Sequence, residues 1–397
     1  MSHIVRFSIY GLAGRKEPFT QVLNRDDNIF FGLNGSGKTL LLKILHSAMS
    51  NDTSMLARVP FTAATVGIYS LNYKKVFTRS IRKSKGLTSN VPTQRYVGRR
   101  LVELQESFIV EPSKEKPALR WKCAPSKPKG AKDAHWQHQY LPTSRLYLAD
   151  EPSFYFERAI SAPSVRSITE DELDAFFAKS AEHLWSNYSS TVLSAVREAQ
   201  EKGLANILRL VLSTKRSTRK PRRPKLSVHT AYTRVQKFLS RQGSDSVLGS
   251  LAAFERRYND DPTLQDVVRD IDAVEQKIDN AMKSRQNLQD LITRMVTGNK
   301  EVKFTDKSIE VRTSDGKDIG LIALSSGEKH LLRIFVQILL ASENTIMIDE
   351  PEISMHVDWQ KNLLSGMRAL NSEAQIILAT HSPEIMADVP DDKIFRL

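Results

Sequence analysis

A glycine-rich loop near the N-terminus constrains the fold of this chain more than any other stretch. Residues 29–39 read Ile-Phe-Phe-Gly-Leu-Asn-Gly-Ser-Gly-Lys-Thr and match the phosphate-binding pattern GxxxxGK(S/T). The run 28–31 predicts a buried strand before the loop, and residues 40–49 predict a helix entered directly from the glycines. Such a loop turns successive backbone N–H groups toward an anion at the helix N-terminus. The stretch therefore predicts a strand, a loop and a helix built around a triphosphate.

Two side chains of the loop have predicted roles. Lys38 is placed to reach the β- and γ-phosphates, and the Thr39 hydroxyl is placed to bind Mg²⁺. The predicted nucleotide-binding residues of the loop are Gly32, Asn34, Gly35, Ser36, Gly37, Lys38, Thr39 and Leu40. The alternative is a glycine-rich turn before an ordinary core helix, and the far end of the chain decides against it.

Composition sets broad limits on the class of protein. With 397 residues, 40% of them hydrophobic and 26% charged, the chain is long enough for two or three packed units. It has neither a leader-like N-terminus nor a run of 18 apolar residues, so we expect a cytoplasmic protein without a membrane partner. The single Cys123 excludes an internal disulfide and a multi-cysteine zinc site. The formal charge of +13 favours polyanionic partners, above all nucleic acid.

The first part of the chain predicts strands. Residues 4–10, 19–23, 59–71 and 73–81 indicate a β layer around the glycine-rich loop. Residues 111–138 are rich in proline and lysine and predict a loop, after which residues 146–148 predict a further strand. His135 and His138 flank Trp136, but no cysteine or carboxylate stands at ligand spacing, so a metal site is not indicated there.

The middle of the chain predicts helices. Thr169 and Glu172 have the spacing of a capping box, and residues 205–212 predict a second helix. Apolar residues from Leu264 to Met295 recur at near-heptad spacing, so we expect an antiparallel hairpin or short coiled coil with the helices around 235–258.

A proline-broken basic run lies between these predicted helices. Its cations are Lys215, Arg216, Arg219, Lys220, Arg222, Arg223 and Lys225. The prolines exclude a helix and predict an exposed loop. Two interpretations stay open: a contact with the nucleic-acid backbone, or a loop that is merely solvated or binds another partner.

The far end of the chain supplies the residues for chemistry. Residues 302–304, 309–312 and 319–322 predict strands and lead to Leu-Ser-Ser-Gly-Glu at 324–328, which is followed by an amphipathic helix. The apolar run 345–348 predicts a buried strand that ends in Asp349 and Glu350. A strand in this position would place Asp349 to hold Mg²⁺ and Glu350 to polarise the water that attacks the γ-phosphate.

Together, these motifs resemble those of ABC-type ATPases of the SMC, RecF and OLD branch. Residues 32–39 match the Walker A motif, 324–328 the signature loop, 346–350 the Walker B motif, and the Thr-His-Ser-Pro at 380–383 the switch histidine. The resemblance implies an α/β ABC-type head, a mixed sheet with a P-loop core and an N-terminal antiparallel β layer, carrying a large helical insertion. The expected domains are residues 1–155 and 301–397 for the two parts of the head and 156–300 for the insertion.

The resemblance also implies a site shared between two copies of the chain. Two ATP molecules with Mg²⁺ would lie between two heads, and Ser325, Ser326, Gly327 and Glu328 of one chain would cap the γ-phosphate held by Lys38 of the other. Glu350, His381 and Lys38 would be the catalytic residues, and Thr39 and Asp349 the Mg²⁺ ligands.

Three departures refine the resemblance. The signature reads Ser-Ser-Gly-Glu, and His356 stands where other branches carry an aspartate; both features resemble the OLD-like subgroup. The Q-loop glutamine is left open among Gln94, Gln105, Gln137 and Gln139. OLD-type nucleases continue into a TOPRIM domain, and the sequence ends at 397 without one.

The resemblance implies an ATP-hydrolysing subunit whose nucleotide-driven dimerisation controls a separate effector, a nuclease or a toxin. ATPases of this resemblance belong to bacterial anti-phage systems such as Septu, PARIS and some retrons. The alternative is a RecF-like or SMC-like ATPase that clamps DNA with its basic loop and helical hairpin. A transporter subunit fits less well because of the long insertion and the altered signature.

Overall fold

The computed structural model describes residues 2–83, 96–97, 100–101, 119–125, 136–143, 170–212, 226–241, 243, 248–296 and 298–397. The chain forms two compact units. The head unit comprises Met1–Leu173 and Ser325–Leu397, and the helical unit comprises Asp174–Leu324. The predicted basic loop at 215–225, the predicted strand at 146–148, Thr169, Gln94 and Gln105 lie outside the described residues.

The head unit contains a parallel sheet in the order β14-β3-β13-β12-β9. Its strands are β3 (Asp27–Phe31), β9 (His138–Leu141), β12 (Thr345–Asp349), β13 (Gln375–Thr380) and β14 (Ile394–Arg396). Every residue of β12 and β13 is buried, which explains why both read as nearly continuous apolar runs. The sheet thus contains both β3, which leads into the glycine-rich loop, and β12, which ends in Asp349.

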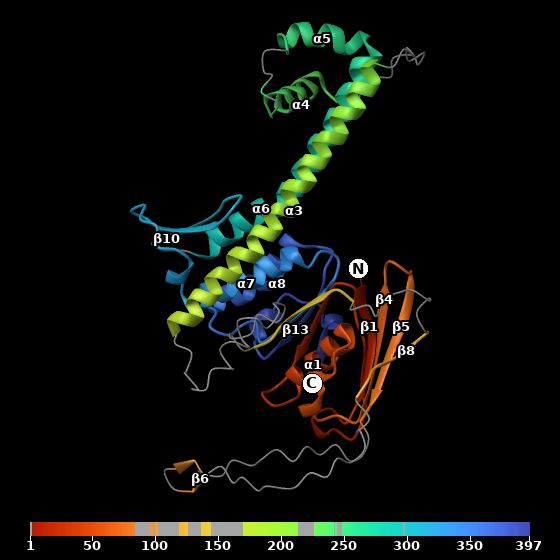
Figure 1. Cartoon of the computed structure of the whole chain (residues 1–397), viewed down its shortest axis with the longest axis vertical. Helices are drawn as coiled ribbons and strands as arrows, with labels where there is room; N and C mark the ends of the chain where they lie inside the picture. The colour runs from red at the N-terminus through yellow and green to blue at the C-terminus, as the bar shows by residue number, and fades with distance from the viewer. Residues whose placement is uncertain are drawn as a thin grey trace, which may run out of the picture. The chain divides into compact units, whose positions relative to one another are not determined.

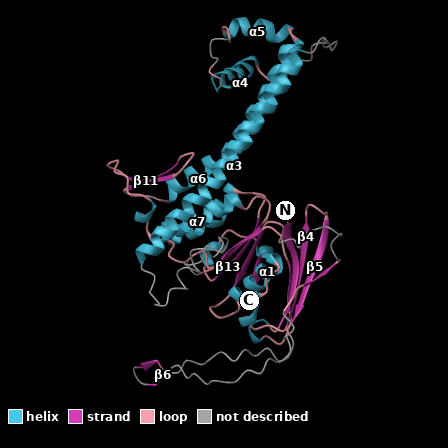
Figure 2. Cartoon of the chain, viewed as in Figure 1, coloured by secondary structure: helices cyan, strands magenta, loops and turns pink. Residues whose placement is uncertain are grey.

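An antiparallel sheet in the order β2-β1-β4-β5-β8 forms the N-terminal layer of the head (Figure 2). Its strands are β1 (Ser2–Tyr10), β2 (Phe19–Val22), β4 (Ala63–Ser70), β5 (Lys75–Arg82) and β8 (Lys122–Ala124). The prediction of a loop over 111–138 is wrong at two places, because β8 pairs with β5 and His138 begins β9. A separate short hairpin joins β6 (Tyr96–Val97) and β7 (Arg100–Leu101).

Helix α1 (Lys38–Ser50) lies between the two sheets, and all three share one apolar core (Figure 1). Leu41, Leu45 and Met49 are fully buried in it, so the helix that leaves the glycine-rich loop is fixed along its length. The other helices of this unit are α7 (Ser326–Leu340), α8 (Val357–Leu370) and α9 (Pro383–Met386), with short 3₁₀ turns at Leu12–Gly14, Ser54–Arg58 and Asp391–Lys393.

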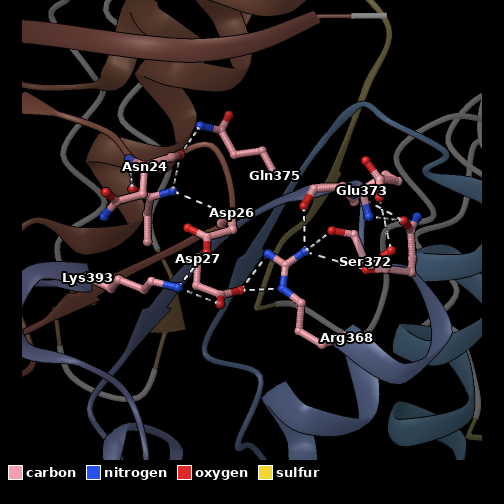
Figure 3. Close-up of polar contacts among 11 residues, drawn as sticks. Asn24, Asp26, Asp27, Arg368, Ser372, Glu373, Gln375 and Lys393 are labelled. Carbon is pink, nitrogen blue, oxygen red and sulfur yellow. Dashed lines mark hydrogen bonds and ion pairs between the residues drawn. The ribbon is translucent and has the colours of Figure 1, made fainter.

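A polar network joins the amino ends of the parallel strands (Figure 3). The buried Gln375 side chain accepts from the backbone N–H of Ile4 at 2.9 Å and donates to the Ile4 carbonyl at 2.7 Å, which ties β13 to β1. Arg368 donates to Asp27 at 2.7 Å, and Lys393 lies 3.5 Å from the same carboxylate. These contacts anchor the amino ends of the strands, and the glycine-rich loop lies at their carboxyl ends.

The helical unit is built on two long helices that lie side by side (Figure 1), α3 (Glu170–Leu212) and α6 (Pro262–Met295). Helices α4 (Val228–Arg241) and α5 (Leu251–Asp260) pack on α6, and Val268, Ile271 and Ile278 form their shared core. The predicted apolar stripe on α6 is therefore confirmed. Residues 205–212 are helical as predicted, but they do not form a separate helix, because α3 is continuous through Gly203, where the missing side chain lets α6 approach. Among the described residues, no helix is long and apolar enough to span a membrane.

The predicted strands at 302–304 and 309–312 are confirmed as β10 (Lys300–Phe304) and β11 (Ile309–Thr313), which pair with each other. The predicted strand at 319–322 is wrong: Leu321–Ala323 forms a 3₁₀ turn. We expected residues 301–324 to belong to the head, but they group with the helical unit. The reason is packing, since Gln289 of α6 donates to the Val302 carbonyl at 2.7 Å and accepts from the Phe304 N–H at 3.0 Å.

Candidate nucleotide site

The carboxyl ends of four neighbouring parallel strands lie at the same end of the sheet, and each strand is followed by a polar residue of the candidate site. β3 leads into the glycine-rich loop and Lys38, β13 into His381, β12 into Glu350, and β9 into Thr143. The carboxyl ends of parallel strands are the usual place for a ligand in an open α/β sheet. Segments from the beginning and the end of the chain thereby surround one space.

That space is a pocket of about 410 Å³ in the head unit. The residues lining it are Asn34, Gly35, Gly37, Lys38, Thr39, Leu40, Thr143, Glu350, Ile353 and His381. Six of them belong to the predicted glycine-rich loop, and all three predicted catalytic residues, Lys38, Glu350 and His381, are among the lining residues. The volume and the polar lining suit a nucleoside triphosphate at the N-terminus of α1.

Gly37 holds the loop in a conformation that other residues rarely adopt. Its φ is 106°, and a Cβ at this position would lie 3.1 Å from the Cβ of Ala13. Gly32 is also tightly enclosed, because a Cβ there would lie 2.7 Å from the carbonyl oxygen of Leu397. Gly32 and Gly37 are therefore packed closely against other parts of the head, which fixes the backbone of the loop at these two positions.

Lys38 is buried at the base of the pocket. Its ammonium donates to the carbonyls of Gly32 at 2.8 Å and Leu33 at 3.3 Å, and it lies 3.3 Å from Glu350 Oε1. A buried ammonium needs such partners, because an unpaired charge in this environment is strongly disfavoured. The pairing places the predicted phosphate-binding cation directly against the predicted catalytic carboxylate.

Asp349 is 1% exposed and is held by hydroxyl groups from two sides. Thr143 donates to its Oδ2 at 2.6 Å, and Thr39 also forms a side-chain hydrogen bond to it. Burial raises the pKa of Asp349, and the Thr143 hydrogen bond opposes that rise. Its Oδ1 is buried and has no hydrogen-bond partner among the described residues. An orphaned carboxylate oxygen beside the Thr39 hydroxyl fits a hard cation such as Mg²⁺.

Glu350 has a strained backbone and a fixed side chain. Its φ of 52° lies in the left-handed region, and its N–H donates to the Ala379 carbonyl at 2.8 Å. Its Oε2 is paired with His381 Nδ1, while its Oε1 faces Lys38. Strain of this kind is tolerated where the surroundings fix the residue, and it commonly marks functional positions.

Comparisons with known proteins agree with this geometry. Residues 207–387 match the sequence model of the family described as AAA domain, putative AbiEii toxin, Type IV TA system. Retron Ec83 probable ATPase of Escherichia coli is 21% identical over 129 residues, which are 29% of this chain and 24% of that protein. Retron Vc95 probable ATPase of Vibrio cholerae serotype O1 biovar El Tor is 27% identical over 93 residues, 20% of this chain and 18% of that protein.

The matched stretch 207–387, which is less than half of the chain, includes the predicted signature loop, Glu350 and His381. The chain matches a quarter or less of the length of the two retron ATPases. Solved structures similar to it include the Smc head domain with an extended coiled coil from Pyrococcus furiosus, with a TM-score of 0.43 and 11% identity over 98% of this chain and 92% of that chain. The SMC head domain from Thermotoga maritima has a TM-score of 0.38 and 10% identity over 97% and 91% of the two chains.

The predicted signature loop is not part of the pocket lining. Ser325 and Ser326 are exposed at the N-terminus of α7, where Ser325 and Glu328 form a capping box. Gly327 is buried, and a Cβ there would lie 2.2 Å from the Ser354 carbonyl oxygen, so only glycine fits. Of the other predicted nucleotide-binding residues, Gly32 and Ser36 are also absent from the pocket lining.

Sequence reasoning missed two residues of the site, Thr143 and Glu352. Thr143 follows β9, whereas two of the candidate Q-loop glutamines lie elsewhere: Gln139 within β9 and Gln137 just before it. Glu352 lies behind His381, and burial raises its pKa. The signal for Glu352 was its position two residues after Glu350. Thr143 gave no signal, because the short strand before it, β9, was not predicted.

Proposed function

We propose that the protein hydrolyses ATP to ADP and phosphate, with Lys38 binding the β- and γ-phosphates, Glu350 orienting the attacking water and His381 contacting the γ-phosphate. The observation that carries the proposal is the ion pair of Lys38 and Glu350 beside Asp349, since it joins distant motifs in one pocket. Thr39 and Asp349 would hold Mg²⁺, which supplies neutralisation of phosphate charge when bound.

The pairing of Lys38 with Glu350 indicates how ATP would act on the carboxylate. Lys38 Nζ lies 3.3 Å from Glu350 Oε1, and a phosphate that takes over the ammonium would leave the carboxylate free to accept a proton from water. Glu350 would then be held by its backbone N–H to Ala379 and by His381. The Lys38 pairing thus prevents an uncompensated buried charge before substrate arrives.

Two variants test this proposal. Lys38→Ala should weaken ATP binding strongly, because it removes the buried phosphate contact. Glu350→Gln should lower kcat by about 10²–10⁴-fold while ATP still binds, since general-base contributions are of that size. Steady-state phosphate release and equilibrium nucleotide binding measure both effects, with the exposed Lys361→Ala on α8 as the control. Turnover at the wild-type rate in either active-site variant would refute the proposal.

We further propose that ATP joins two heads. The exposed serines at the N-terminus of α7 support this, because the positive end of the helix dipole suits a phosphate bound to another copy. The signature residues do not line the pocket of their own chain, so a second copy is the natural source of that contact.

We propose that the joined heads control a separate effector, a nuclease or toxin, in bacterial anti-phage defence. The similarity to two retron ATPases supports this role. Phage plaque counts on cells that carry the native locus test it: wild type should reduce plating, and Lys38→Ala should restore it. Equal protection by both would separate the defence role from ATP binding.

The rival function is a RecF-like or SMC-like ATPase that binds DNA. The net charge of +13 favours it. In that case DNA should stimulate ATP hydrolysis, and neutralising the seven cations between Lys215 and Lys225 should abolish the stimulation without any co-purifying protein. A DNA-independent rate would exclude this alternative.

A further inference from the structure

A second carboxylate, Glu352, stands behind the switch histidine. It is 6% exposed and does not line the nucleotide pocket. One of its oxygens, Oε1, accepts three hydrogen bonds: from Thr380 Oγ1 at 2.6 Å, from the N–H of His381 at 2.8 Å and from the N–H of Ser382 at 3.1 Å. Two of these donors are backbone groups, so the carboxylate fixes the main chain at the point where β13 ends.

The same oxygen also faces the imidazole ring. Glu352 Oε1 lies 3.0 Å from His381 Nδ1, which is paired with Glu350 Oε2 on its other side. Both neighbours of Nδ1 are acceptors, so we assign a proton to Nδ1. Nε2, on the other side of the ring, can then donate to a phosphate oxygen only as part of an imidazolium, in which both ring nitrogens carry protons. The His381 side chain is 46% exposed, so solvent contacts alone would not hold the ring.

We propose that Glu352 is a positioning residue for ATP hydrolysis, acting only through His381 by fixing its backbone and its ring. The proposal rests on the proposed hydrolysis of ATP at this site. Three bonds converging on one buried oxygen make a stiff support, because the charged acceptor strengthens each of them. A misplacement of about 1 Å in a catalytic group can cost on the order of 10²-fold in rate.

Kinetics of two Glu352 variants test the proposal. Glu352→Ala should lower kcat by about 10²-fold with the KM for ATP changed less than about 3-fold, because the residue does not line the pocket. Glu352→Gln should recover most of the rate, because its carbonyl oxygen can accept the same backbone N–H groups. The control is Glu384→Gln in α9, whose carboxylate accepts from the Ser382 hydroxyl at 3.2 Å; this variant should behave as wild type.

A double-mutant cycle decides whether Glu352 works through His381. In a His381→Ala background, Glu352→Ala should cause little further loss, because the group that it positions is gone. Equal fold losses in the two backgrounds would overturn the proposal, as would a Glu352→Gln variant as slow as Glu352→Ala. Either result would leave ATP hydrolysis itself intact, so the failure would be distinct from failure of the proposed function.

Hydrogen exchange supplies a measurement that needs no turnover. In the nucleotide-free protein, the amides of His381 and Ser382 should exchange at least 10-fold faster in Glu352→Ala than in wild type, while peptides of β12 keep their protection. Unchanged exchange at both amides would overturn the proposal. Faster exchange across the whole head would also count against it, because it would show a general structural role.

Discussion

At the scale of single residues, Thr143 is the hydroxyl that completes the surroundings of Asp349. Its bond of 2.6 Å to Oδ2 leaves Oδ1 directed away from the protein donors. Groups that orient a metal ligand typically change affinity or activity by 10–100-fold when removed. Thr143 is therefore expected to influence the affinity for Mg²⁺ and not the binding of the adenine.

Thr143→Val tests this role, because valine keeps the shape and removes the hydroxyl. The Mg²⁺ concentration that gives half-maximal ATPase activity should rise by about 10-fold or more. Thr143→Ser is the matched control and should retain most of the activity, since its hydroxyl can donate to the same oxygen. An unchanged Mg²⁺ titration in Thr143→Val would contradict the assignment.

A half-buried histidine pair joins α1 to β9. His46 Nδ1 and His138 Nε2 are 2.7 Å apart, and His138 Nδ1 donates to the Trp136 carbonyl at 2.7 Å. If His138 carries its proton on Nδ1, its Nε2 accepts and His46 Nδ1 donates. Burial lowers the pKa of His46 to about 4, and Asp52 opposes the shift.

This pair predicts acid sensitivity. An unfolded histidine takes up a proton near pH 6.5, whereas folded His46 resists until about pH 4, so the unfolded state binds more protons in between. The free energy of unfolding should therefore fall as the pH drops from 6.5 to 4, by up to roughly 3 kcal/mol from this group. His46→Gln should flatten that slope in urea titrations, whereas the exposed His229→Gln should not. Parallel slopes in wild type and His46→Gln would be inconsistent with this account.

At the scale of elements, the contact between α3 and α6 depends on a missing side chain. A Cβ on Gly203 would lie 2.3 Å from Val274 Cγ2, much closer than atoms pack in protein interiors. Glycine in a helix costs about 1 kcal/mol relative to alanine, so the position sacrifices local helix stability for close packing. Sequence patterns reflect only the low helix propensity of glycine and not the close packing. They therefore predicted two helices where the structure has the single helix α3.

The close packing of Gly203 against Val274 predicts that Gly203→Ala changes the free energy of unfolding in opposite directions, depending on the side chain at position 274. Gly203→Ala should destabilise the wild-type protein, because overpacking costs about 1–3 kcal/mol and exceeds the gain in helix propensity. In a Val274→Ala background the same substitution should be neutral or stabilising. Thermal or urea unfolding measures the cycle, and a stabilising Gly203→Ala in both backgrounds would show that the helices do not approach so closely.

Elements with a strong period or a fixed motif were the predictable ones. The stripe on α6 and the buried strands β12 and β13 follow from apolar spacing and apolar runs. β8 and β9 could not be predicted, because they are short, and what defines them is pairing with β5 and β12. Tertiary partners decide such strands, and local preference does not.

At the scale of the whole molecule, the site could be predicted because its motifs follow strands. Lys38, Glu350 and His381 each stand directly after a strand or its loop, and parallel strands bring their carboxyl ends together. The unit boundary at Leu324 could not be predicted, since it depends on the packing of β10 against α6.

The proposed joining of heads predicts a change in molecular mass. With ATP and Mg²⁺, Glu350→Gln should shift from 44.9 kDa toward twice that mass in light scattering, because bound ATP is not consumed. Adding Ser326→Arg should block the shift by crowding the exposed N-terminus of α7, without loss of ATP binding. Ser365→Arg, exposed on α8, is the matched control. A Glu350→Gln protein that stays at 44.9 kDa with saturating ATP would rule out dimerisation through nucleotide.

The order of strands in the parallel sheet has a consequence for synthesis on the ribosome. β3 leaves the exit tunnel early, but both of its neighbours, β13 and β14, are translated after residue 374. The antiparallel layer can pair while translation continues, whereas the glycine-rich loop must wait for distant segments that close slowly. Until then β3 has two open edges, and we expect chaperones to bind the nascent chain there.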